Sequence, residues 1–175
     1  MLIRRETASD VPGVRALVAA AFGGSPTEPA TTDEVRLIDL LRAGPDWLPT
    51  LSLVARTPDG DLAGHVVCTR AWIADVEVVG LGPLAVRPDQ QGRGVGSALV
   101  HAVLGAAEAG GAPVVGLLGS TVYYARFGFR PASTFGIESP QAAWGDHFQA
   151  RLFVPPDRAP RGAFRYAAAF GQLGG

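Results

Sequence analysis

The 175-residue sequence contains no lysine and no asparagine, and all fifteen of its basic residues are arginine. An enzyme that forms a Schiff base or uses a lysine nucleophile is therefore excluded. The phosphate loop of nucleoside triphosphatases is excluded for the same reason, because that loop requires a lysine. Any site that depends on an asparagine side chain is excluded as well.

Cysteine and net charge are also scarce. The single cysteine, Cys68, cannot form an intramolecular disulfide, and no Cys/His cluster has the spacing of a metal site, so no metal is predicted. The net charge of −1 leaves no basic excess for nucleic acid or for an anionic membrane surface. No apolar run reaches the roughly 20 residues of a membrane span. We therefore expect a cytoplasmic protein with neither nucleic acid nor membrane as a partner.

The composition is that of a folded chain, with 47% hydrophobic and 18% charged residues. A chain of this length buries roughly 70% of its unfolded surface without disulfides or metals. We expect one domain over residues 1–175, best supported over 1–130, with C-terminal strands in 131–175. The tail from residue 158 carries little signal.

Hydrophobic periodicity predicts a mixed α/β fold. Helices are expected from Pro12 to about Phe22, over 33–43, from Val95 to about Ala106, and over 121–127, with a loop over 23–32. Strands are expected over 2–6, 51–56, 62–73, 76–86, 114–118 and 148–154. The strand over 76–86 contains Gly80, Gly82 and Pro83. Proline cannot donate to a strand ladder and glycine weakens it, so this strand should bulge or lose its partner there.

A glycine-rich loop follows that strand and precedes a helix. Gly92, Gly94 and Gly96 remove the Cβ atoms that would hold an anion away from the free N–H groups of the first helical turn, and Ser97 adds a hydroxyl. A dinucleotide fingerprint fits poorly, because its glycine spacing is not met. The residues alone are compatible with an anion site or with a glycine turn that binds nothing.

Two motifs in this order resemble the GCN5-related N-acetyltransferase (GNAT) family, and within it a bacterial subgroup of small predicted acetyltransferases. Gln91, Gly94 and Gly96 match the family signature Q/R-x-x-G-x-G/A directly after the interrupted strand. The segment from Tyr124 to Phe129 is similar to the family's tyrosine-x-x-x-glycine-phenylalanine segment. The resemblance implies a mixed central sheet with a splayed pair of parallel strands and flanking helices.

The resemblance also implies acetyl-CoA as cosubstrate, with pantetheine lying between the splayed strands. For two of the residues assigned below, the sequence allows an alternative role: Arg93 is equally compatible with a solvent-exposed loop side chain that contacts no phosphate, and Ser120 with a cap at the start of the helix over 121–127. The residues that the resemblance assigns to acetyl-CoA are Leu84, Ala85, Val86, Gln91, Gly92, Arg93, Gly94, Val95, Gly96, Ser97 and Ser120.

Two catalytic roles carry over from the family. The backbone N–H of Leu84 is expected to stabilise the oxyanion, and Tyr124 to protonate the leaving thiolate, although packing alone would also explain this tyrosine. Tyr123 is expected to be structural or to line the substrate side. Relatives with a carboxylate or imidazole base carry it where this chain has glycine, so Asp75, Glu77, His65 or a water relay are the candidates for the base.

The predicted function is acetyl transfer from acetyl-CoA to a primary amine of a small molecule or peptide, by a monomer or homodimer. The acceptor pocket is expected among residues 23–32, the strand over 62–73 and the segment after Pro131. Trp47, Trp72 and Trp144 are candidates for its walls, although tryptophans are usually core residues. The alternative is a non-catalytic acyl-CoA sensor of the same fold. A serine hydrolase is disfavoured, because no serine lies in a G-x-S-x-G motif.

Overall fold

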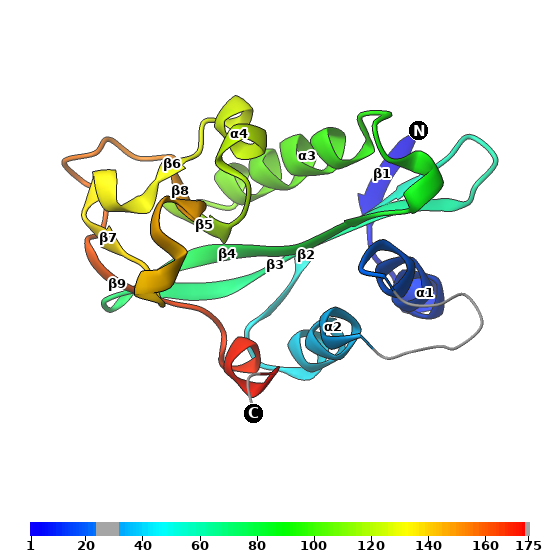
Figure 1. The fold of residues 1–175 in the computed structure, drawn as a ribbon, viewed down its shortest axis with the longest axis horizontal. Helices are drawn as coiled ribbons and strands as arrows, with labels where there is room; N and C mark the ends of the chain where they lie inside the picture. The colour runs from blue at the N-terminus through cyan, green and yellow to red at the C-terminus, as the bar shows by residue number, and fades with distance from the viewer. Residues whose placement is uncertain (24–31, 174–175) are drawn as a thin grey trace.

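The computed structural model describes residues 1–23 and 32–173 and forms one mixed sheet between two layers of helices (Figure 1). The strands are β1 (Leu2–Arg5), β2 (Trp47–Arg56), β3 (Leu62–Ile73), β4 (Val76–Val86), β5 (Val114–Leu118), β6 (Arg130–Pro131), β7 (Ile137–Glu138), β8 (Phe148–Leu152) and β9 (Gly162–Arg165). Their order in the sheet is β1-β2-β3-β4-β5-β8-β6, and β9 pairs with both β3 and β7.

Helices cover both faces of this sheet. One face carries α3, and the other carries α1 and α2 (Figure 1). Pro12 lies in the first turn of α1, and the hydroxyl of Thr32 accepts the N–H of Val35 at the start of α2, so both helices begin where helix-start residues occur. The helices are α1 (Val11–Ala21), α2 (Asp33–Ala43), α3 (Val95–Ala109) and α4 (Thr121–Tyr124).

The expected strands over 62–73 and 76–86 and the helix over 33–43 have the observed bounds, whereas β2 begins at Trp47 instead of Leu51. C-terminal strands were expected in 131–175 without bounds in the tail, which forms β9 and a 3₁₀ segment, Ala168–Leu173. These short elements are held by pairing with β3 and packing against α2, which local sequence does not encode. Most of the loop expected over 23–32 lies outside the described residues.

The two central parallel strands separate beyond Gly80. Strand β4 pairs with β5 only at Val79↔Val115 and Gly80↔Gly116, and it continues to Val86 without that partner. On the other side of β4, the pairing with β3 changes register between Leu81 and Leu84, where β4 contains the residues Gly82 and Pro83. The predicted interruption is therefore confirmed, and the sheet has a gap between β4 and β5.

The side of the gap nearest α3 is fixed by a packed core. Leu99, Val100 and Val103 of α3 are fully buried against the sheet in a cluster that includes Val66 of β3 and Leu81 of β4. Burying such side chains stabilises the fold by about 1.5–3 kcal/mol each. This packing holds the N-terminus of α3 beside the free part of β4.

A buried polar cluster ties the chain after β1 to β2, β3 and α2. The carboxylate of Glu6 lies 2.8 Å from His65 Nε2, accepts the Ser52 hydroxyl at 2.5 Å, and accepts Arg42 Nη2 at 2.6 Å. Burial alone would raise the pKa of Glu6, but these hydrogen bonds and the charges of His65 and Arg42 outweigh it and lower the pKa to about 2. The ionised carboxylate is therefore the stable form in the folded protein.

Acid is expected to destabilise the fold through Glu6. Because its folded pKa lies below the unfolded value of 4.5, the stabilisation is complete above about pH 4.5 and is lost as the pH falls toward 2. This linkage is worth about 3 kcal/mol. Urea unfolding of the Glu6→Gln variant should show a free energy of unfolding lower by about 2 kcal/mol at pH 7 and a shallower loss in acid.

The exposed Glu108 on α3 supplies the control for that measurement. The Glu108→Gln variant should unfold like the parent at every pH. An equal acid slope in the parent and in Glu6→Gln would show that Glu6 does not carry the effect.

Candidate active site

A cleft of about 500 Å³ opens where the free end of β4, the start of α3 and the helix α4 meet. Its two β4 residues, Leu84 and Val86, belong to the part of β4 that has no β5 partner. The cleft is lined by Leu84, Val86, Gln90, Gln91, Gly92, Gly94, Val95, Gly96, Ser97, Tyr123 and Arg126.

The N-terminus of α3 forms one wall and is not capped by a side chain. Gly94 occupies the N-cap position with φ of +83°, a left-handed conformation, and the first helical hydrogen bond runs from Ala98 N–H to Gly94 C=O at 2.9 Å. The preceding N–H groups therefore have no partner within the helix. Together with the helix dipole, they make this end attractive to an anion.

Gly96 allows the opposite wall to approach the helix. A Cβ atom at this position would lie only 2.9 Å from the Tyr123 hydroxyl oxygen. The Arg126 guanidinium lies over the Tyr123 ring, 5.0 Å from its centroid. Arg126 was not predicted, and Tyr123 was expected to be structural or to line the substrate side. Their spacing of three residues puts them on one helical face.

The free part of β4 presents its backbone groups to the gap. Arg87 N–H donates to Ala63 C=O of the β3 side at 2.9 Å. Because successive residues of a strand direct their backbone groups to opposite sides, the N–H and C=O groups of Leu84 and Val86 face away from β3. Val86 C=O accepts the side-chain amide of Gln91 at 3.2 Å. The N–H of Leu84 thus points toward the gap, where β5 has separated.

Eight of the eleven residues predicted to contact acetyl-CoA line this cleft, and three do not. The Ala85 side chain is buried in the core formed with α1 and α2. Arg93 is exposed on the loop outside the lining. Ser120 caps α4, since its hydroxyl accepts the Tyr123 N–H at 3.2 Å. The cap interpretation of Ser120 is therefore observed.

Tyr124 is half-buried against Gly119, directly after β5, and is not among the residues that line the cleft. Its ring centroid is 4.9 Å from that of Tyr123 and 5.7 Å from that of Phe129, both in edge-to-face geometry. Burial raises the pKa of Tyr124 to about 12, and the nearby Tyr123 and Cys68 add to the shift. The phenol is consequently protonated at neutral pH and able to act as a proton donor.

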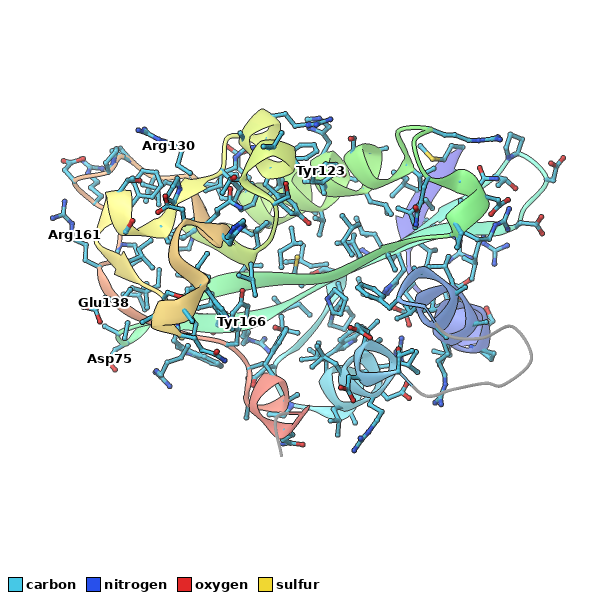
Figure 2. The ribbon with its side chains drawn as sticks, viewed as in Figure 1. Asp75, Tyr123, Arg130, Glu138, Arg161 and Tyr166 are labelled. Atoms are coloured by element: carbon cyan, nitrogen blue, oxygen red, sulfur yellow. The ribbon has the colours of Figure 1, made fainter. Side chains whose placement is uncertain are left out.

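The three candidate bases lie outside the cleft. His65 is completely buried in the cluster with Glu6. Glu77 is exposed and lies 3.4 Å from Arg70. Asp75 lies in the turn between β3 and β4, at one end of the sheet (Figure 2). None of these side chains is among the lining residues.

Of the three tryptophans expected around an acceptor, two line a second cavity of about 540 Å³. Trp72 and Trp144 belong to its wall, together with Tyr166. Trp47 instead packs against the α1/α2 core, with the Arg42 guanidinium 5.5 Å above its ring. Two of the three tryptophans thus line one cavity, and Tyr166, which was not named, comes from the segment after Pro131 that was expected to contribute.

Within residues 1–23 and 32–173, no helix is both long and apolar enough to cross a bilayer. Over the same two stretches, no group of three or more histidine, cysteine, aspartate or glutamate side chains is arranged to hold a metal ion.

Known proteins share this sequence pattern and this architecture. Residues 18–129 match the profile of the acetyltransferase (GNAT) family. The chain is 34% identical to the uncharacterized N-acetyltransferase YhbS of Escherichia coli strain K12 over 135 residues, which is 76% of this chain and 75% of YhbS. The gap between β4 and β5, the glycine loop and the tyrosine segment thus occur together in a chain that matches GNAT acetyltransferases by sequence.

Solved structures of GNAT acetyltransferases have the same fold as this chain. The crystal structure of Escherichia coli YhbS in complex with CoA matches with a TM-score of 0.86 and 26% identity, covering 99% of this chain and 93% of that one. A GNAT acetyltransferase of Brucella melitensis in complex with acetyl-CoA matches with a TM-score of 0.76 and 33% identity, covering 97% of both chains. The chain belongs to the GNAT family of acetyltransferases.

Proposed function

We propose that this protein transfers an acetyl group from acetyl-CoA to a primary amine of a small molecule or peptide. The observation that carries the proposal is the gap between β4 and β5, which ends at the uncapped N-terminus of α3. The complexes of Escherichia coli YhbS with CoA and of the Brucella melitensis enzyme with acetyl-CoA support the choice of cosubstrate.

The cleft suits the shape and charge of CoA. The diphosphate accepts hydrogen bonds from N–H groups of the glycine loop and the first turn of α3, and the Arg126 guanidinium supplies a positive charge beside them. The pantetheine arm lies in the gap and pairs with the outward backbone groups of Leu84 and Val86, of which Val86 C=O also accepts the Gln91 amide, as an added strand would. Binding therefore depends mainly on backbone groups, which glycine leaves accessible.

The chemistry follows from groups around the gap. The amine lone pair attacks the thioester carbonyl carbon, a carbon–nitrogen bond forms, and the carbon–sulfur bond breaks. Leu84 N–H stabilises the negative charge that develops on the carbonyl oxygen. Tyr124 gives its proton to the departing sulfur and regains one from solvent. The amine releases its proton to water, because His65 is buried with Glu6 and Glu77 is exposed beside Arg70.

A thiol-release assay with a panel of amines and peptides tests this function. The only cysteine, Cys68, is buried and its pKa is raised by burial, so native protein contributes no thiol signal. We expect CoA release that depends on an amine, with the acetylated amine detected by mass spectrometry. Tight binding of acetyl-CoA without transfer to any amine would instead identify a non-catalytic acyl-CoA sensor.

A further inference from the structure

The second cavity lies on the far side of the gap from the cleft. Its walls carry four aromatic rings and two charged groups, namely Trp72, Trp144, Tyr166, Phe170, Asp46 and Arg165. Its volume of about 540 Å³ is within the range of small-molecule sites, and the prevalence of aromatic walls is typical of them.

Tyr166 joins this cavity to the gap. Its ring packs on Gly80, the last residue of β4 that pairs with β5, because a Cβ atom there would lie 2.9 Å from Tyr166 Cδ1. The Tyr166 ring lies 6.4 Å from that of Trp144. Figure 2 shows Tyr166 and Tyr123 on opposite sides of the central strands. A molecule in the cavity can therefore approach the gap from the face opposite to CoA.

Tyr166 and Tyr124 pack against the two strands that border the gap: Tyr166 against Gly80 of β4, and Tyr124 against Gly119, the residue after β5. Burial raises the pKa of Tyr166, and the proximity of Tyr124 and Cys68 raises it further, while the backbone amide of Leu118 opposes the shift. Leu118 ends β5, on the other side of the gap from β4. The inner end of the cavity is thus beside the tyrosine that we propose as the proton donor.

Two charged groups of the cavity wall, Arg165 and Asp46, have no ion-pair partner among the described residues, but they differ in their other contacts. Arg165 is held over the Trp72 ring at 5.8 Å and donates to Ala74 C=O at 3.2 Å. Arg70, whose backbone pairs with that of Asp46, directs its guanidinium to Glu77 and to a backbone carbonyl. In the part of the chain that the structure describes, no ion pair neutralises the Asp46 carboxylate.

The distance between Asp46 and the gap follows from the sheet. Trp47, next to Asp46, is opposite Thr69 of β3, and Thr69 is opposite Gly80 of β4. Adjacent strands are about 4.8 Å apart, so two steps separate the two positions by about 10 Å. An acceptor that fills the cavity would extend over this distance.

We propose that this cavity binds the acceptor, and that the acceptor is an amine carrying a second positive group about 10 Å from the reacting nitrogen. Asp46 pairs with the second cation, the aromatic rings cover the apolar chain between the two nitrogens, and the reacting amine lies at Tyr166. Carboxylate and aromatic faces together recognise organic cations, and they disfavour a molecule with a negative group at the same end. This assignment rests on the proposed acetyltransferase function.

Three probes of equal length test the assignment. 1,7-Diaminoheptane, heptylamine and 7-aminoheptanoate carry a positive, a neutral and a negative group at the far end of one chain. We expect kcat/KM to fall in that order, by about tenfold or more at each step. In the Asp46→Asn variant the preference for the diamine over heptylamine should fall by about tenfold, mainly through KM, while acetyl-CoA binding is retained.

The exposed Asp59, in the turn between β2 and β3, provides the matched control. The Asp59→Asn variant should keep the parent's order of probes, and Trp144→Ala should raise KM for all three. Equal kcat/KM for the three probes, no effect of Asp46→Asn, or transfer only to unrelated amines would overturn the acceptor assignment. Failure of every amine to release CoA would instead contradict the acetyltransferase function.

Discussion

Replacing Gly94 with valine is expected to abolish acetyl-CoA binding at the concentrations that saturate the parent protein. Gly94 has φ of +83° and forms the N-cap of α3. A β-branched residue is strained there by about 1–3 kcal/mol or more, so the loop would relax to another conformation. The N–H groups would then no longer converge on a diphosphate. Isothermal titration calorimetry should show at least a hundredfold weaker binding.

A valine at Gly60 is the control that separates the loss of stability caused by backbone strain from the disruption of the glycine loop around Gly94. Gly60 has φ of +91° in the turn between β2 and β3, and a Cβ atom there would meet nothing within 4 Å, as at Gly94. The Gly60→Val variant should lose a similar amount of thermal stability but bind acetyl-CoA normally. If Gly94→Val also bound normally, the diphosphate would not lie at this loop.

Replacing Tyr124 with phenylalanine is expected to lower kcat by about a hundredfold with little change in acetyl-CoA affinity. The substitution removes only the proton donor, and general acid catalysis contributes about 10²–10⁴ in rate. The pKa of about 12 keeps the Tyr124 phenol protonated in alkali. The parent's rate should therefore rise as the acceptor amine loses its proton and show no decline up to about pH 11.

Tyr123 is the matched control for that substitution, because its hydroxyl borders the cleft near Gly96. Tyr123→Phe should change the KM for acetyl-CoA more than kcat. A Tyr124→Phe variant with the parent's kcat, measured in single-turnover experiments that exclude product release, would remove Tyr124 from the mechanism.

Local patterns predicted the long elements and the interruption of β4. Strands 62–73 and 76–86 were delimited by turn residues and apolar runs, and Gly80, Gly82 and Pro83 predicted the loss of pairing that the register shows. C-terminal strands were expected in 131–175, but the positions of the short β7 and β9 were not predicted. They have two and four residues, and their pairing with each other and with β3 stabilises them.

The sequence predicted the part of the candidate site that consists of backbone groups. Glycines that allow anion binding have a recognisable spacing, and eight of the predicted contacts line one cleft. Side chains that reach the site from elsewhere were not recognised. Arg126 arrives from the segment after α4, and Tyr166 from the tail that carried little signal.

By itself, the sequence determined the α/β class, the broken strand and the glycine loop that follows it, because each depends on residues that are neighbours along the chain. Only the tertiary structure decided which side chains face the gap. It buried His65 with Glu6, kept Ala85 in the core, and brought Tyr166 against Gly80. These outcomes depend on strand pairing and core packing between distant segments, whose energies are set by the whole fold.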